Sequence, residues 1–163
     1  MADYIDIKKI SSDRDDLDKL NLEENWIPSS LNTRRSEDLQ KKYEIQLKYI
    51  DDWYLSFKDY ILCEIFNFDC EMTNDGKLIH VYPENDFYIK SRLEINKFPY
   101  LLPKNTKHYV MWFLEKQTDE NIINQHILIE IISKNIFAKK VVWYENPKIH
   151  NDIYHIHVFL NIN

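Results

Sequence analysis

Tyr154-His155-Ile156-His157-Val158-Phe159, near the C-terminus, alternates histidine or aromatic residues with aliphatic ones from His155 onward. Successive side chains of a β-strand point to opposite faces of its sheet, so His155 and His157 share one face while Ile156 and Val158 share the other. The aliphatic side chains predict the face that is buried in a core. This stretch therefore predicts a sheet strand that carries two imidazoles on its second face.

The rest of the chain predicts an α+β domain: a helical N-terminal half, then a small, largely antiparallel sheet with a helix packed on one face. Ser36 is a favourable N-cap for a first helix, and a second helical pattern covers about residues 56–66. The turn signal Asn74-Asp75-Gly76 comes before two short predicted strands at 78–82 and 87–89. Beyond them the pattern predicts a strand at 108–114, an Ile-rich helix at about 119–135, and strands at 141–144 and 153–162.

The chain of 163 residues, 44% of them hydrophobic, is long enough for one domain with its own core. Residues 1–30 are rich in Asp, Lys and Ser and predict a mobile or loosely docked arm, which leaves residues 31–163 as the domain. The sequence shows neither a signal-peptide pattern nor an apolar stretch of about 20 residues, so we expect a cytoplasmic or nuclear protein outside the membrane. Cys63 and Cys70 are too few for a disulfide framework and are expected to be free thiols.

Charge and glycine content exclude several classes of function. The net charge of −6 argues against non-specific nucleic-acid binding, which depends on Lys and Arg at the phosphate backbone. The single glycine, Gly76, cannot supply the glycine-rich turns by which nucleotide-binding motifs cradle phosphates. P-loop and dinucleotide-binding functions are therefore not expected.

The candidate chemistry centres on histidines. His155 and His157 can act as acid and base, or bind one divalent metal ion, and His108 is the candidate third imidazole. Two half-exposed histidines on a sheet surface are the structural alternative. Trp112 and Trp143 are candidates either for stacking against a ligand or for simple core packing. The sequence identifies no cofactor beyond that metal hypothesis and does not give an oligomeric state.

Arg35 stands beside Arg34 just before the first predicted helix, where guanidinium groups and open backbone amides can bind an anion. The alternative is a pair of salt bridges to acidic neighbours. Both interpretations remain open from the sequence alone.

Four segments carry a resemblance: Asn96-Lys97-Phe98-Pro99-Tyr100, His108-Tyr109-Val110-Met111-Trp112, Trp143-Tyr144-Glu145-Asn146-Pro147 and His155-Ile156-His157-Val158. In this order they resemble a fungal and large-DNA-virus family of unknown function whose fungal members are called N-acetylglucosamine-induced proteins. The resemblance covers about residues 26–160. Lys97 stands where that family has an acid, and residues 148–152 replace a Leu-x-Ser-x-Pro connector.

The resemblance implies a link to sugar or nucleotide-sugar metabolism, but no known reaction. It also implies one grouping, since Asn96, Tyr100, His108, Trp112, Asn146, His155 and His157 fall on motif positions of the family. We expect these residues to line a small-molecule pocket. Three functions remain open: an enzyme that uses the histidines, a non-catalytic metabolite-sensing or protein-interaction module, and a His-x-His metal-dependent nuclease. The nuclease is the weakest, since no helix with a nucleophilic Tyr follows His157.

Overall fold

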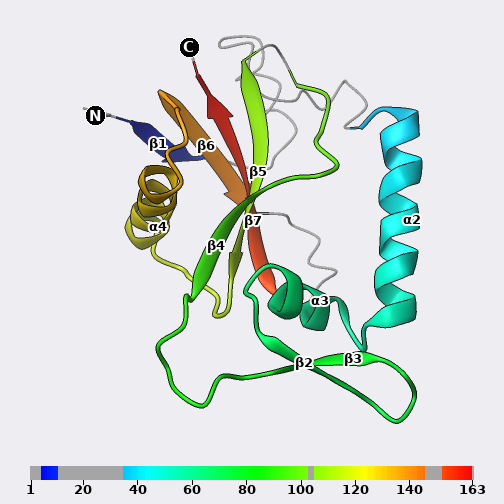
Figure 1. The fold of residues 1–163 in the computed structure, drawn as a ribbon. Coiled ribbons are helices and arrows are strands. Elements are labelled where there is room, and N and C mark those ends of the chain that lie inside the picture. The colour runs from blue at the N-terminus through cyan, green and yellow to red at the C-terminus, as the bar shows by residue number, and fades with distance from the viewer. Residues whose placement is uncertain (1–4, 11–34, 103–104, 146–151, 163) are drawn as a thin grey trace.

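The computed structural model describes residues 5–10, 35–102, 105–145 and 152–162, and its elements form a mixed α/β fold (Figure 1). Helices and strands, in chain order, are β1 (Asp6–Lys9), α2 (Glu37–Trp53), α3 (Phe57–Glu64), β2 (Asp69–Met72), β3 (Leu78–Val81), β4 (Ser91–Ile95), β5 (Thr106–Phe113), α4 (Glu120–Ser133), β6 (Lys140–Glu145) and β7 (Tyr154–Asn161). Two sheets result, a five-stranded one and the β2–β3 hairpin.

The five-stranded sheet has the order β1-β6-β7-β5-β4, with antiparallel pairing from β6 to β4. Its other edge strand, β1, runs parallel to β6, so the sheet is mixed. Residues 6–9 lie in the segment predicted as a mobile or loosely docked arm, but they are a strand of the central sheet. Ile5 and Ile7 pack against the core beside it, which gives this short charged segment an apolar anchor.

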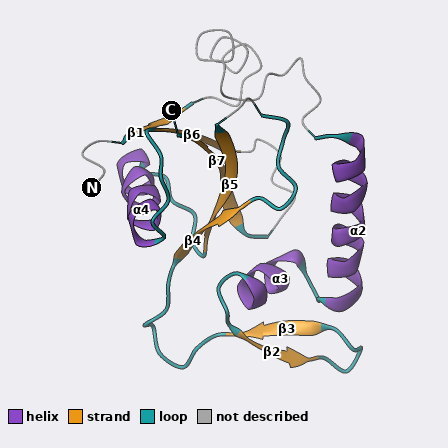
Figure 2. Ribbon diagram, turned by 45° about the horizontal axis from the view of Figure 1, so that its top comes forward, coloured by secondary structure: helices purple, strands orange, loops and turns teal. Residues whose placement is uncertain are grey.

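Helix α4 covers one face of the sheet, as predicted (Figure 2). Its buried side chains are Ile123, Ile127 and Ile131, spaced at helical intervals. They pack against the aliphatic face of β7, where Ile156 and Val158 have no solvent exposure. The predicted division of the β7 side chains between the two faces is confirmed.

The second face is also covered, because α3 packs Ile61 and Leu62 against Val110 and Trp112 of β5. Figures 1 and 2 show α2 and α3 on the side of the sheet away from α4. Ser36 accepts a hydrogen bond from the backbone N–H of the third residue of α2 at 3.2 Å, as expected of an N-cap.

The predicted helical N-terminal half is not confirmed. Strand β1 precedes α2 and α3, the β2–β3 hairpin and β4 follow them, and the third helix lies at residues 120–133. The turn at Asn74-Asp75-Gly76 joins β2 to β3, so the partner of β3 comes before the turn and not at 87–89. In the described part of the chain, no helix is long and apolar enough to cross a membrane.

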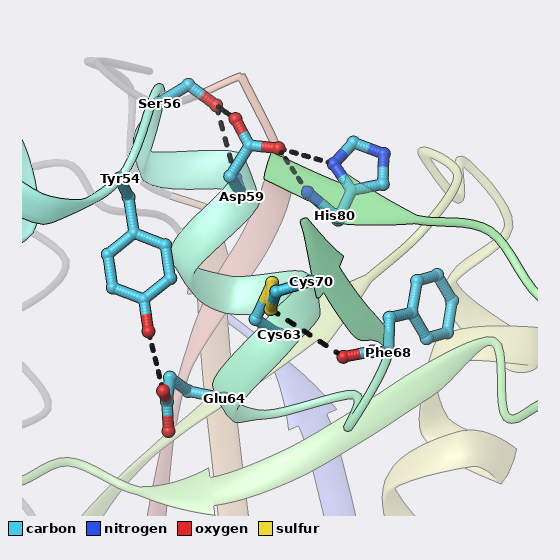
Figure 3. The surroundings of a disulfide bond; sticks show 8 residues. All are labelled: Tyr54, Ser56, Asp59, Cys63, Glu64, Phe68, Cys70 and His80. Carbon is cyan, nitrogen blue, oxygen red and sulfur yellow. Dashed lines mark hydrogen bonds and ion pairs between the residues drawn. A yellow bond between two sulfur atoms is a disulfide. The ribbon is translucent and has the colours of Figure 1, made fainter. Parts of the chain in front are cut away.

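Cys63 and Cys70 form a disulfide, so the expectation of two free thiols was wrong (Figure 3). Cys63 lies near the end of α3, and Asn67 adopts a positive φ of 57° in the turn that follows. This turn returns the chain along α3 and brings the two Cα atoms to 6.2 Å. The spacing of the cysteines in the sequence does not reveal such a local reversal.

Candidate functional site

The sheet face opposite α4 brings together the predicted histidine residues. Trp112 of β5 lies directly opposite His155 of β7, and Val110 lies opposite His157. His108, two residues before Val110, projects to the same face and lies opposite Phe159. The predicted sharing of one face by His155 and His157 is thus confirmed, and His108 and Trp112 project to the same face.

His108 and His157 form a buried pair, with 2.9 Å between His108 Nε2 and His157 Nδ1. The backbone N–H of Tyr100 donates to His108 Nδ1 at 3.3 Å, which makes Nδ1 an acceptor and places the proton of neutral His108 on Nε2. That proton is donated to His157 Nδ1, so neutral His157 carries its own proton on Nε2. One fixed backbone N–H therefore sets the tautomers of both rings.

The loop from Asn96 to Tyr100 folds over this pair. The side-chain oxygen of Asn96 accepts from the backbone N–H of Phe98 at 2.8 Å, and the Asn96 backbone N–H donates to the His108 carbonyl at 2.9 Å. The Tyr100 ring packs 4.5 Å from the His108 ring, between centroids. The structure thus groups Asn96, Tyr100, His108 and His157. The loop holds the His108 ring in place through hydrogen bonds and ring packing, and His108 in turn is bonded to His157.

Arg35 fastens the same loop to the start of α2. Its Nε donates to the Phe98 carbonyl at 2.7 Å, and its guanidinium lies 4.2 Å from the Tyr43 ring centroid and 5.0 Å from that of Tyr100. These contacts engage Arg35 with a carbonyl and two rings. Arg35 therefore lies at the rim of the site, where it links the loop to the start of α2.

His155 differs from the buried pair, since it is only half-buried and lies beside a cavity. Its Nδ1 lies 3.4 Å from the carbonyl of Ile153, a long hydrogen bond in which Nδ1–H donates and Nε2 keeps its lone pair. Burial lowers the pKa of His155, although the bond to Ile153 acts in the opposite direction. Its ring lies 4.8 Å from that of Trp112. Burial therefore favours the neutral form of His155, whose Nε2 is an acceptor nitrogen.

A cavity of about 360 Å³, here called the sheet–helix cavity, lies between this sheet face and helices α2 and α3. Its floor includes Trp112, His155 and His157, and its walls carry the aromatic side chains of Tyr43, Phe57, Tyr60 and Phe98. Small-molecule sites are typically concave and mostly apolar, with a few polar groups and volumes of roughly 300–1,000 Å³. The sheet–helix cavity has the size and lining of such a site.

Sequence reasoning missed Arg92, which lies on β4 and lines the sheet–helix cavity. It lies directly opposite Trp112, so that Arg92, Trp112 and His155 form one row across three strands. The signal was present in the sequence, because Arg92 to Ile95 alternates polar and apolar residues as a half-buried strand does.

Three predicted site residues do not line the sheet–helix cavity: Trp143, and also Tyr100 and His108, which belong to the neighbouring cluster with His157. Trp143 is fully buried on the α4 face of the sheet, where its indole N–H donates to Asn124 at 2.7 Å. It belongs to the core and not to the cavity floor. Asn146 lies outside the described residues.

The geometry of the paired histidines gives the metal hypothesis no support of its own. The rings of His155 and His157 are 5.7 Å apart and inclined at 75°. The hydrogen bonds that start at Tyr100 engage His157 Nδ1 and place a proton on its Nε2, and a metal ion would have to displace that proton. Among the residues that the structure describes, no group of three or more His, Cys, Asp or Glu side chains could hold a metal ion.

Comparison with known proteins informs the fold. No protein-family model matches the chain, and no curated protein matches it. The crystal structure of a protein designated HTC1 is similar to this chain, with a TM-score of 0.50 and 16% sequence identity. The likeness covers 94% of this chain and 85% of that one. Because a fold can host unrelated activities, the likeness concerns the fold alone.

Proposed function

We propose that the protein binds a small polar metabolite, of the sugar or nucleotide-sugar class, in the sheet–helix cavity. The observation that carries this proposal is the cavity itself, about 360 Å³ with His155 and Trp112 in its floor. Aromatic walls offer apolar contact to the faces of a sugar ring or a base, while Gln46 and Asn67, which also line the cavity, offer amide hydrogen bonds to hydroxyl groups. The sugar class follows from the resemblance to N-acetylglucosamine-induced proteins.

The buried His157 and the half-buried His155 are suited to different roles at this cavity. His157 is 6% exposed and hydrogen-bonded to His108, so its contribution is to hold the floor in place. His155 offers its Nε2 lone pair to a ligand hydroxyl or amide N–H. The ligand contact therefore falls to His155, and the buried pair positions it.

The place of His155 in the cavity lining favours a second candidate, an enzyme. Burial lowers the pKa of His155 and so favours the neutral imidazole, which can accept a proton from a substrate hydroxyl as a general base and return it to a leaving group. His155 would be the catalytic residue. A regulatory module would use the same cavity without this proton transfer.

A ligand screen with a matched pair of variants tests the proposal. We expect sugars, sugar phosphates or nucleotide sugars to raise the melting temperature of the wild-type protein, and His155→Ala to lose this shift. His126→Ala is the control, because His126 is also half-buried but lies on α4, away from the cavity. Product formation from the bound compound would select the enzyme, and binding without turnover the module. A screen without any shift, or a shift that survives in His155→Ala, would count against the proposal.

A further inference from the structure

We propose that the ligand of the sheet–helix cavity carries an anionic group, a phosphate ester or a carboxylate, and that Arg92 binds it. This inference rests on the proposed function and specifies the chemical class of the ligand. Arg92 is half-buried on β4, and its Nε is buried without a hydrogen-bond partner among the described residues. A buried N–H without an acceptor costs free energy, and a guanidinium that turns toward a ligand anion in the cavity would recover it.

The carboxylates around the cavity leave Arg92 available. Glu64 accepts a hydrogen bond from the Tyr54 hydroxyl at 2.6 Å, and Glu94 pairs with Lys134 at 3.3 Å. Both glutamates line the cavity, yet within the described part of the chain neither forms an ion pair with Arg92. Among the described residues, the guanidinium therefore has no carboxylate partner and can bind a planar, two-oxygen acceptor.

The other cations of the cavity are placed differently. Arg35 is engaged by the Phe98 carbonyl and by two aromatic rings. Lys97 is an exposed side chain on the loop at the rim, where water screens its charge. Arg92 is thus the cation that combines burial, a place on the rigid sheet and an unsatisfied donor.

The row Arg92–Trp112–His155 also indicates how long a ligand must be to contact both Arg92 and His155. Arg92 and His155 stand on strands separated by two strand spacings, which amount to about 10 Å. A single molecule in contact with both presents its anion over β4 and a hydroxyl or amide over β7, with its body above Trp112. A hexose phosphate or a nucleotide sugar has this extent, whereas inorganic phosphate does not.

Calorimetric titration at low ionic strength tests the inference with three hexose probes of similar size: glucose, glucuronate and glucose 6-phosphate. We expect at least one anionic probe to bind the wild-type protein more tightly than glucose does. Arg92→Gln should weaken that binding by about 10- to 100-fold and leave the affinity for glucose unchanged. Lys97→Gln removes the same charge from the rim and should reduce the affinity for the anionic probe less than threefold, as expected of a screened surface charge.

The outcomes separate the two proposals. If glucose binds as tightly as both anions, or if Arg92→Gln binds the anions as the wild type does, the anionic subsite is wrong while the sheet–helix cavity stands as a ligand site. If none of the three probes binds, the anionic subsite is likewise rejected, and the wider metabolite screen then decides the proposed function. Thermal melts of Arg92→Gln without ligand give an independent readout: we expect an equal or higher melting temperature than that of the wild type, whereas a clear decrease would assign Arg92 a structural role.

Discussion

His108 Nε2 lies 2.9 Å from His157 Nδ1, so two of the three predicted catalytic histidines are hydrogen-bonded to each other inside the fold. The Tyr100 backbone N–H, which donates to His108 Nδ1, fixes the direction of this bond. The Tyr100 backbone N–H, the two rings and the loop from Asn96 to Tyr100 thus form one buried, hydrogen-bonded cluster. The histidine that can serve a ligand is their neighbour, His155.

The tautomers of the buried pair are a first prediction. We expect nitrogen NMR of the wild-type protein at neutral pH to show both His108 and His157 protonated at Nε2, because each Nδ1 accepts a hydrogen bond. His155 should instead carry its proton on Nδ1, facing the Ile153 carbonyl. A His157 protonated at Nδ1 would contradict the assigned direction of the hydrogen bonds from Tyr100 through His108 to His157.

Substitution of the two β7 histidines should have unequal effects on stability. His157→Ala removes a buried ring and leaves the His108 Nε2–H without its acceptor, so we expect the free energy of unfolding to fall by about 2 to 4 kcal/mol. His155→Ala removes a half-buried ring with one long hydrogen bond, and the loss should be about 1 kcal/mol or less. Urea denaturation of both variants checks the ranking, and equal losses would refute the assigned roles.

His155 should also make stability depend on pH. Burial lowers its pKa in the folded protein below the ordinary value of 6.5, so the unfolded chain binds more protons on this residue as the pH falls through that value. The contribution of His155 to stability is then complete above pH 6.5 and is lost as the pH falls toward the folded pKa. Urea denaturation between pH 5 and 8 should show a weaker pH dependence for His155→Gln than for the wild type; identical slopes would speak against the lowered pKa.

Asp59 is expected to be the main polar anchor of the β2–β3 hairpin (Figure 3). It accepts hydrogen bonds from the Ser56 hydroxyl at 2.6 Å and the His80 backbone N–H at 3.0 Å, and lies 2.5 Å from His80 Nδ1. Asp59→Ala should lower the free energy of unfolding by about 2 to 4 kcal/mol, since these donors lose their acceptor. Asp52→Ala, an exposed aspartate of α2, is the control and should change it by less than about 0.5 kcal/mol.

Asp59 has its own pH signature. Burial raises the pKa of its carboxyl, but the hydrogen bonds from Ser56 and His80 outweigh burial and lower the pKa below the ordinary 3.8. Its contribution is therefore present above about pH 3.8 and lost as the pH falls through the folded pKa. The stability difference between wild type and Asp59→Ala should shrink in strong acid, and a constant difference would contradict this assignment.

The sequence was most informative where one side-chain pattern belongs to one strand or helix. Alternation at 155–159 was enough to place His155 and His157 on one face and the aliphatic residues on the other, because strand geometry alone decides this. The three helices were predicted for the same reason. The grouping of Asn96, Tyr100 and His108 came from the resemblance, and contacts of the loop with His108 now account for it.

Features that depend on distant segments were not predicted. Strand β1 is a short charged segment whose place beside β6 follows from two isoleucines that meet a core far along the chain. The place of Arg92 in the site depends on the strand register, which aligns it with Trp112 and His155. Strand register is set by tertiary packing and could not be predicted from the sequence. The hydrogen bond between His108 and His157 likewise joins residues 49 positions apart.

A crystal structure of the protein with the best-binding compound from the metabolite screen tests the central claim most directly. We predict electron density for the compound in the sheet–helix cavity, over Trp112, with a polar atom within hydrogen-bonding distance of His155 Nε2. Density for the compound at any other surface, with this cavity left to water, would contradict the account.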